Sequence, residues 1–97
     1  MCRIAVLVSD HTDDLNQRIS ILTDAMAHGG PDDAGCYIDP QLPVALGHRR
    51  LSIIDTSAAG HQPMASSHNR YQITFNGEIY NFQELKKEIQ NHAFQST

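Results

Sequence analysis

Three neighbouring residues, Asn76-Gly77-Glu78, offer groups that could stabilise a developing negative charge and hold a cation. In a tight turn they would leave backbone N–H groups pointing outward. The Asn76 amide and such an N–H could then stabilise a developing negative oxygen, with Glu78 beside them to hold an ammonium group. Gly77 would permit a positive φ, because it has no Cβ. The alternative is an ordinary β-hairpin turn, for which Asn-Gly between apolar runs is a strong signal.

Cys2 is a candidate nucleophile because of its position in the chain. If Met1 is removed, Cys2 carries a thiol and a free α-amine on one residue. An α-amine has a pKa of about 7.7–8.0, so it could serve as general base to its own thiol, as in N-terminal nucleophile enzymes. The alternative is a buried or incidental cysteine.

Arg50 ends an apolar run, where a guanidinium can hold a carboxylate through two parallel hydrogen bonds. The alternative is an arginine solvated at the surface. Arg49, next to it on an expected strand, would face the opposite side. The six histidines have neither HxxxH nor HxH spacing, so we expect no metal site.

The elements that would position these groups alternate between strands and helices. Short apolar runs rich in β-branched residues predict a buried strand over 3–8 and further strands over 34–39, 44–51 with 52–55 after a kink, and 71–75. A loop rich in small polar residues is expected over 56–67. Such a mixture of strands and helices predicts an α/β or α+β sheet protein.

Two helices are expected from apolar residues at helical spacing. The first, about four turns long, follows Asp13 or Asp14 and has an apolar face formed by Leu15, Ile19, Leu22 and Met26. The second begins at Asn81, with Glu84 completing a capping box, and ends near Asn91. Because this helix follows Gly77 so closely, a returning hairpin strand is disfavoured.

The composition limits the classes of protein to be considered. The chain has 97 residues, of which 40% are hydrophobic and 19% are charged, as in one ordinary globular domain. The net charge of −4, with no basic cluster beyond residues 48–50, makes nucleic acid and anionic membranes poor candidate partners. No apolar run approaches the roughly 20 residues that span a bilayer, and no leader is evident, so we expect a cytoplasmic protein with reduced thiols at Cys2 and Cys36.

Five segments, taken together, resemble the glutamine-hydrolysing domain of class II amidotransferases, most closely the type found in glutamine-hydrolysing asparagine synthases. They are Met1-Cys2-x-Ile4-Ala5, His28-x-Gly30-Pro31-Asp32-Asp33-x-Gly35, Leu46-Gly47-His48-Arg49-Arg50-Leu51-Ser52-Ile53-Ile54-Asp55, Gly60-His61-Gln62-Pro63-Met64 and Phe75-Asn76-Gly77-Glu78-Ile79-Tyr80-Asn81. Their order and spacing cover nearly the whole chain, which makes the resemblance specific.

The resemblance implies an α+β fold of the N-terminal nucleophile type, an αββα sandwich of antiparallel sheets. It also implies that Cys2 attacks the side-chain amide of glutamine, releases ammonia and leaves a thioester that water hydrolyses. Asn76 and the Gly77 N–H would form the oxyanion hole, and Glu78 would bind the α-ammonium of glutamine. The α-carboxylate would be held by Arg50, in a pocket lined by the backbone of Leu51, Ser52, Ile53 and Ile54.

The sequence departs from the family pattern at three positions and in length. Arg3 replaces a small residue after the nucleophile, Val6 replaces a glycine, and Gly29 replaces an arginine. Residues 1–97 are expected to be about the first half of the glutaminase domain, without the synthetase domain for which the family needs ATP and Mg²⁺. Uncovered sheet surface then predicts self-association or a partner chain that completes the sandwich.

Two other functional interpretations stay open from the sequence. One is a non-catalytic remnant or interaction module that keeps the amidotransferase fold. The other is a small thiol hydrolase unrelated to glutamine, which is disfavoured because Arg50 and Glu78 are complementary anchors for an amino acid. Stabilisation by glutamine would separate the amidotransferase from both alternatives.

Overall fold

The computed structural model describes residues 2–10, 13–89 and 93–94, which form short strands, helices and 3₁₀ turns. The elements are β1 (Arg3–Val8), α1 (Leu15–Ala25), the 3₁₀ turn η1 (Ala27–Gly29), β2 (Asp33–Ile38), β3 (Val44–Arg50), the 3₁₀ turn η2 (Ala58–Gly60), β4 (Met64–Ala65), β5 (Gln72–Ile73) and α2 (Phe82–Glu88). All strand pairs are antiparallel. The predicted α+β class with antiparallel sheets is confirmed.

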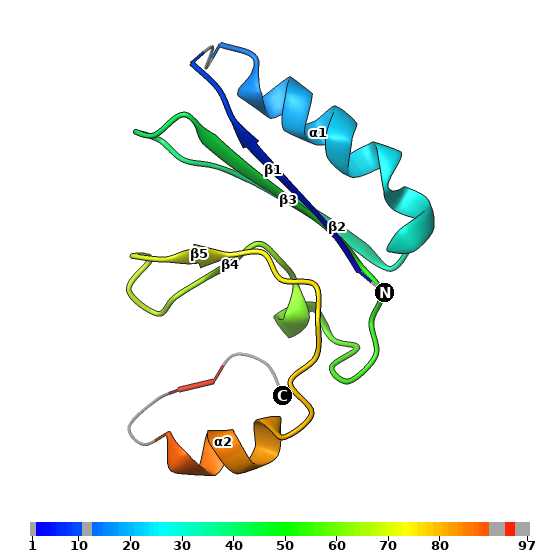
Figure 1. Cartoon of the computed structure of the whole chain (residues 1–97), viewed down its shortest axis with the longest axis vertical. Helices are drawn as coiled ribbons and strands as arrows, with labels where there is room; N and C mark the ends of the chain where they lie inside the picture. The colour runs from blue at the N-terminus through cyan, green and yellow to red at the C-terminus, as the bar shows by residue number, and fades with distance from the viewer. Residues whose placement is uncertain (1, 11–12, 90–92, 95–97) are drawn as a thin grey trace.

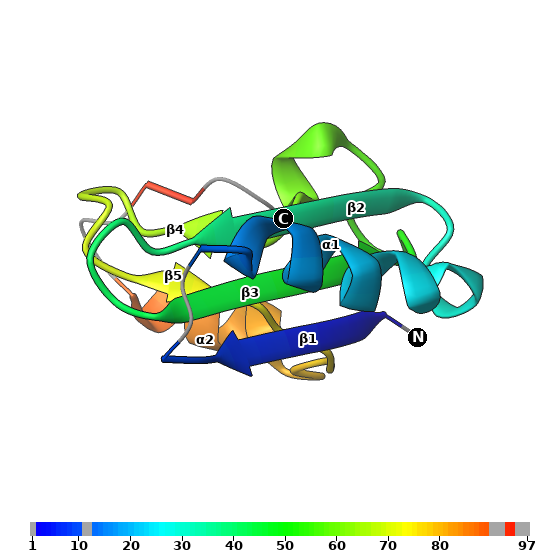
Figure 2. The ribbon, with the colours of Figure 1, turned by 90° about the horizontal axis from the view of Figure 1, so that it is seen from above.

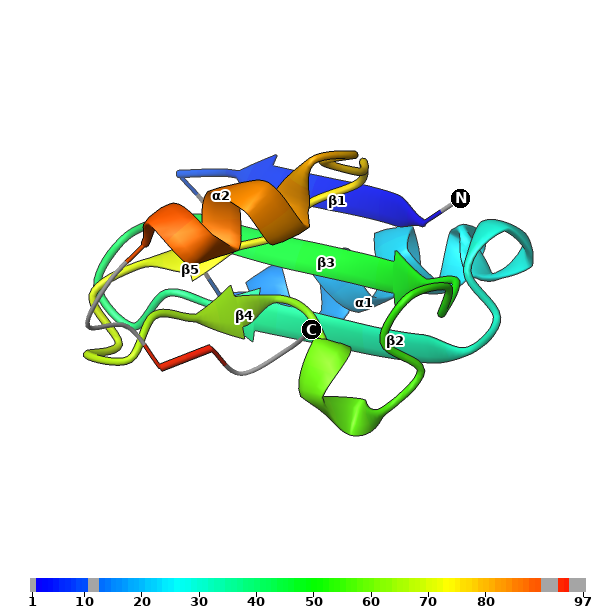
Figure 3. The ribbon, with the colours of Figure 1, turned by 90° about the horizontal axis from the view of Figure 1, so that it is seen from below.

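The elements are stacked in successive layers. Strand β3 lies at the centre of a three-stranded sheet with β1 and β2 on either side, while β4 and β5 pair with each other in a second sheet. In Figure 1, helix α1, the three-stranded sheet, the β4–β5 pair and helix α2 follow one another from top to bottom. Figure 2 shows α1 across one face of the three-stranded sheet, and Figure 3 shows β4, β5 and α2 on the opposite side.

The core lies between α1 and the three-stranded sheet. Leu15 and Ile19 of α1 and Ala45 of β3 are buried there. Thr23 is buried too, whereas Leu22, which was expected on the apolar face, is 43% exposed. Gly47 explains the difference: a Cβ on Gly47 would lie 2.1 Å from the Thr23 hydroxyl oxygen, so this glycine makes room for Thr23 against β3.

Residues 3–8 form a strand, as predicted, but the prediction that this strand is buried is wrong. Ile4, Val6 and Val8 are all exposed. The reason is topological, because β1 is an edge strand. Its register with β3 sets Val6 opposite Leu46, on the face away from α1, where the second sheet leaves β1 uncovered.

Several element boundaries also differ from the expectations. Helix α1 has 11 residues, about three turns, and Asp14 precedes it without a side-chain cap. The predicted capping box at Asn81 does not form, since its side chain makes no cap hydrogen bond. Helix α2 is helical to Glu88, and the end predicted near Asn91 lies outside the described residues. Residues 52–55 form no strand.

The predicted strand over 71–75 is reduced to the two residues of β5. Beyond Ile73 the chain makes no ladder pairing: the Phe75 N–H donates to the Gln62 side chain instead. Among the described helices, none is both long and apolar enough to cross a membrane.

Candidate active site

The pairing of β1 with β3 brings Cys2 to the end of β3. Arg3 is paired with Arg49 in this antiparallel ladder, so Cys2 lies beside the residues that follow Arg49. The Leu51 N–H donates to Cys2 Sγ at 3.3 Å, and the thiol lies 3.6 Å from the Leu51 carbonyl oxygen, which can accept its proton. These contacts orient the sulfur, which is half-buried.

Cys2 opens into a pocket of about 230 Å³ that brings together most of the predicted site residues. The predicted residues in its lining are Cys2, Arg50, Leu51, Ile53, Ile54, Gly77 and Glu78. A thiol, a cation and an anion therefore face one small cavity. Its size is below the roughly 300–1,000 Å³ of pockets for drug-sized ligands, which suits a molecule as small as an amino acid.

Two predicted site residues lie outside this pocket lining. Ser52 lines a neighbouring pocket, and its N–H donates to Asp32 Oδ2 at 2.8 Å. Asn76 is exposed and does not line the Cys2 pocket. The structure thus gathers the anchors of the predicted site but leaves the Asn76 side chain apart from the sulfur.

Arg50 is buried at the boundary between the two pockets and is already hydrogen-bonded to the loop after β3. Its Nη1 donates to the Ser57 carbonyl at 2.6 Å, and Nη2 donates to the Asp55 carbonyl. A Cβ at Gly60 would lie 2.2 Å from Nη2, so a larger residue at this position would displace the guanidinium. Arg49 makes a separate contact, donating from Nε to the Gly30 carbonyl at 2.9 Å.

Residues 76–78 do not form the tight turn predicted from Asn-Gly. Among the described glycines, Gly77 included, none has a positive φ, and residues 74–79 belong to no helix or strand. The hairpin alternative is wrong as well, because the chain runs on into α2. The absence of a side chain at Gly77 matters for a different reason: a Cβ there would lie 2.9 Å from the Phe75 ring.

Two of the departures from the family pattern meet in space. A Cβ on Gly29 would lie 2.7 Å from Arg3 Nε and 2.9 Å from its Cζ. Arg3 also donates from Nη1 to the Cys2 carbonyl at 3.2 Å. The Arg3 side chain therefore lies over Gly29 and does not line the Cys2 pocket.

The neighbouring pocket contains a histidine–carboxylate contact that the sequence did not predict. His61 Nδ1 lies 2.6 Å from Asp33 Oδ2. Burial acts to raise the pKa of Asp33, but hydrogen bonds from His61 and the Ala34 N–H, together with the charges of His61 and Arg50, leave that pKa below its usual value. Across the described residues, no group of three or more His, Cys, Asp or Glu side chains is placed to hold a metal ion.

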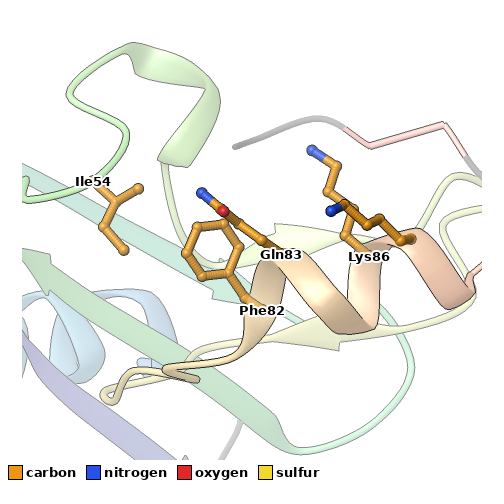
Figure 4. Close-up of a pocket in the computed structure, with 5 residues that line it drawn as sticks. Ile54, Phe82, Gln83 and Lys86 are labelled. Atoms are coloured by element: carbon orange, nitrogen blue, oxygen red, sulfur yellow. The ribbon is translucent and has the colours of Figure 1, made fainter.

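A third, shallow pocket lies between the loop after β3 and helix α2. Ile54 and Phe82 form its apolar part, with Gln83, Lys86 and Lys87 around them (Figure 4). Ile54 also lines the Cys2 pocket, so it separates the two cavities.

Sequence reasoning missed two groups that hold Phe75, the residue just before the 76–78 segment. Gln62 lines the Cys2 pocket and accepts the Phe75 N–H at 2.7 Å, and His48 Nε2 lies 3.1 Å from the Phe75 carbonyl oxygen. Burial lowers the pKa of His48, although the Phe75 carbonyl and Asp33 act to raise it. Both residues stand within the family-like segments, where nothing in their local spacing indicates these contacts.

The fold and the pocket together define a class of protein, and comparison with known proteins identifies it. The family model described as "Glutamine amidotransferase domain" matches residues 1–97, so the chain belongs to this family.

Several relatives are glutamine-hydrolysing asparagine synthetases. "Asparagine synthetase [glutamine-hydrolyzing] 1" of Arabidopsis thaliana is 36% identical over 98 residues, covering 99% of this chain. "Asparagine synthetase [glutamine-hydrolyzing] 1" of Bacillus subtilis (strain 168) is 38% identical over 98 residues, covering 97% of this chain and 15% of the relative. "Putative asparagine synthetase [glutamine-hydrolyzing] 2" of Methanocaldococcus jannaschii is 34% identical over 105 residues, covering 92% of this chain and 20% of the relative. The chain spans 16% of the length of the Arabidopsis relative.

Proposed function

We propose that this chain hydrolyses the side-chain amide of glutamine at Cys2 and so supplies ammonia, as a glutamine-hydrolysing asparagine synthase requires. The observation that carries the proposal is the single pocket lined by Cys2, Arg50 and Glu78. A free amino acid has a carboxylate and an ammonium group, and the pocket offers charge of the opposite sign to each: Arg50 for the carboxylate, and Glu78 for the ammonium.

The proposed reaction follows from these positions. The Cys2 thiolate attacks the amide carbon of glutamine, and the thiol proton passes through the α-amine to the departing nitrogen. Breaking the C–N bond releases ammonia and leaves a thioester on Sγ, which water then hydrolyses to glutamate and the free thiol. The Gly77 N–H and the Asn76 amide would stabilise the oxyanion, which requires Asn76 to turn toward the pocket when glutamine binds.

We also propose that the layers belong to an αββα sandwich. The order α1, three-stranded sheet, β4–β5 pair and α2 supports this arrangement (Figure 1). In the parent reaction the released ammonia would go to an ATP-activated aspartate or a similar carboxylate, in keeping with the names of the relatives as asparagine synthetases.

Labelling of the purified chain with a diazo-ketone analogue of glutamine tests the proposal. Intact mass should show that Met1 is absent, and peptide mapping should show label on Cys2 with little on Cys36, which is exposed and serves as the internal control. Excess glutamine should block the labelling, and Cys2→Ala should remove it together with glutamate release. Equal labelling of both thiols, or a retained Met1, would count against the proposal.

A second candidate function is a non-catalytic module with the amidotransferase fold. Two observations favour it: the Arg50 guanidinium donates to the Ser57 and Asp55 carbonyls, and Asn76 lies outside the pocket lining. Thermal unfolding separates the two functions. Glutamine should raise the midpoint if Arg50 and Glu78 bind it, with asparagine as the shorter control, and should leave the midpoint unchanged in a module without the site.

A further inference from the structure

The segment with Asn76, Gly77 and Glu78 has no regular secondary structure to fix its position. Residues 74–79 form neither a helix nor a ladder, although Gly77 and Glu78 line the Cys2 pocket. Catalytic groups must be held to within a fraction of an ångström to be effective. Some other part of the molecule must therefore hold this segment in place.

A side chain from β3 and one from the loop before β4 hold the carbonyl and the N–H of Phe75. The Gln62 side-chain oxygen accepts the Phe75 N–H at 2.7 Å. His48 Nε2 donates to the Phe75 carbonyl at 3.1 Å, and the His48 side chain is buried. One residue earlier, Thr74 Oγ1 donates to the Gly47 carbonyl at 3.2 Å.

This attachment extends to the pocket through the Phe75 ring. A Cβ on Gly77 would lie 2.9 Å from that ring, so ring and glycine backbone are in close contact. His48 stands two residues before Arg50 on β3, so both side chains leave the strand on the same face. The distance between the Arg50 anchor and the Gly77 N–H thus depends on the two bonds to Phe75.

We propose that His48 and Gln62 are positioning residues that hold Phe75 and thereby set Gly77 and Glu78 against Cys2 and Arg50; this inference rests on the proposed function. Neither residue is assigned a part in bond making. Each acts through the Phe75 backbone, and Gln62 does so from the wall of the pocket itself.

Substitution of Gln62 tests the proposal through turnover. Gln62→Met keeps the length of the side chain but has no strong acceptor, so kcat for glutamine hydrolysis should fall by about ten- to a hundredfold as the Gly77 N–H is misplaced, and KM should rise as the Glu78 anchor moves with it. Gln62→Glu keeps an acceptor and should restore much of kcat. Gln17→Met makes the same change on the exposed surface of α1 and should have no effect.

Hydrogen exchange of the Phe75 amide tests the same contact without any need for turnover. The Phe75 N–H should be protected in the wild-type chain, lose protection in Gln62→Met and keep it in Gln62→Glu and Gln17→Met. If the wild type releases no glutamate but this pattern holds, the proposed function fails while the attachment of Phe75 stands. An unprotected Phe75 amide in the wild type, or an unchanged kcat in Gln62→Met of an active chain, overturns the positioning role.

Discussion

At the scale of single residues, His48 links stability to pH. Burial lowers its pKa in the folded chain, whereas the unfolded chain should have the ordinary value of about 6.5. Between these two values the unfolded state binds more protons, so the free energy of unfolding should fall as the pH drops through about 6.5 and level off below the folded pKa. Urea unfolding at a series of pH values would measure this dependence.

The control for that experiment is His48→Gln, which keeps a donor for the Phe75 carbonyl but does not titrate. Its stability should lose the dependence near pH 6.5. The lowered pKa of Asp33 does not interfere, because its contribution is present above the ordinary carboxyl value of 3.8 and is lost only as the pH falls through the lower folded value. An identical slope near pH 6.5 in both proteins would show that another group is responsible.

Arg3 and Gly29 show how two departures from a family pattern can be one structural feature. Taken singly from the sequence, a bulky cation after Cys2 could either help or obstruct the reaction, and the lost arginine concerns a structural or coupling contact and not the chemistry itself. In the structure the Arg3 guanidinium lies against Gly29, where any Cβ would collide with it. A cation beside position 29 is thus supplied from β1 instead of by residue 29 itself, and neither change can be judged without the other.

At the scale of elements, the contact between α1 and β3 depends on Gly47 and Thr23. Gly47→Ala would push a Cβ to within 2.1 Å of Thr23 Oγ1, wedging the helix from the sheet and destabilising the chain by about 1–3 kcal/mol. Thr23→Ala in the same chain removes the colliding oxygen. The double variant should therefore be more stable than the sum of the single changes predicts, as a double-mutant cycle by urea unfolding would measure.

Simple additivity of those two substitutions would contradict a direct contact. Ala45→Gly on the same strand is a useful comparison, because it removes a buried methyl group and introduces no clash. Its effect on the free energy of unfolding should add to that of Thr23→Ala.

The main elements, and the meeting of Cys2, Arg50 and Glu78 in one pocket, could be predicted because their signals are local. Apolar runs indicated β1 and β3, helical spacing indicated α1, and the family-like motifs indicated Cys2, Arg50 and Glu78 for one site. The failures concern contacts between distant segments. Thr23 is buried in place of Leu22 because Gly47, 24 positions away in the sequence, has no side chain. The strand ends after Ile73 because Phe75 bonds to Gln62 and His48 instead of to a neighbouring strand.

The same limit applies to Asn76-Gly77. Local chemistry predicted a turn with positive φ, but no described glycine has one. Gly77 is instead required by the nearness of the Phe75 ring, and a contact of that kind leaves no mark in the dipeptide itself.

At the scale of the whole molecule, the uncovered edge of the three-stranded sheet should cause self-association. β1 is an edge strand, and Ile4, Val6 and Val8 expose 42%, 56% and 68% of their surfaces. An exposed apolar edge of this kind is a template for pairing with another chain. Sedimentation velocity should therefore show oligomers that increase with protein concentration.

Val6→Lys should reduce this association, because a lysine on an edge strand opposes pairing with a second chain. Gln17→Lys, on the exposed surface of α1, is the matched control and should associate as the wild type does. Each variant changes the formal net charge from −4 to −3, since −4 + 1 = −3. Because a smaller net charge weakens repulsion between copies, a loss of oligomers in Val6→Lys alone cannot arise from overall charge and must come from β1. A wild-type chain that stays monomeric, or two variants that behave alike, would contradict this role for the edge.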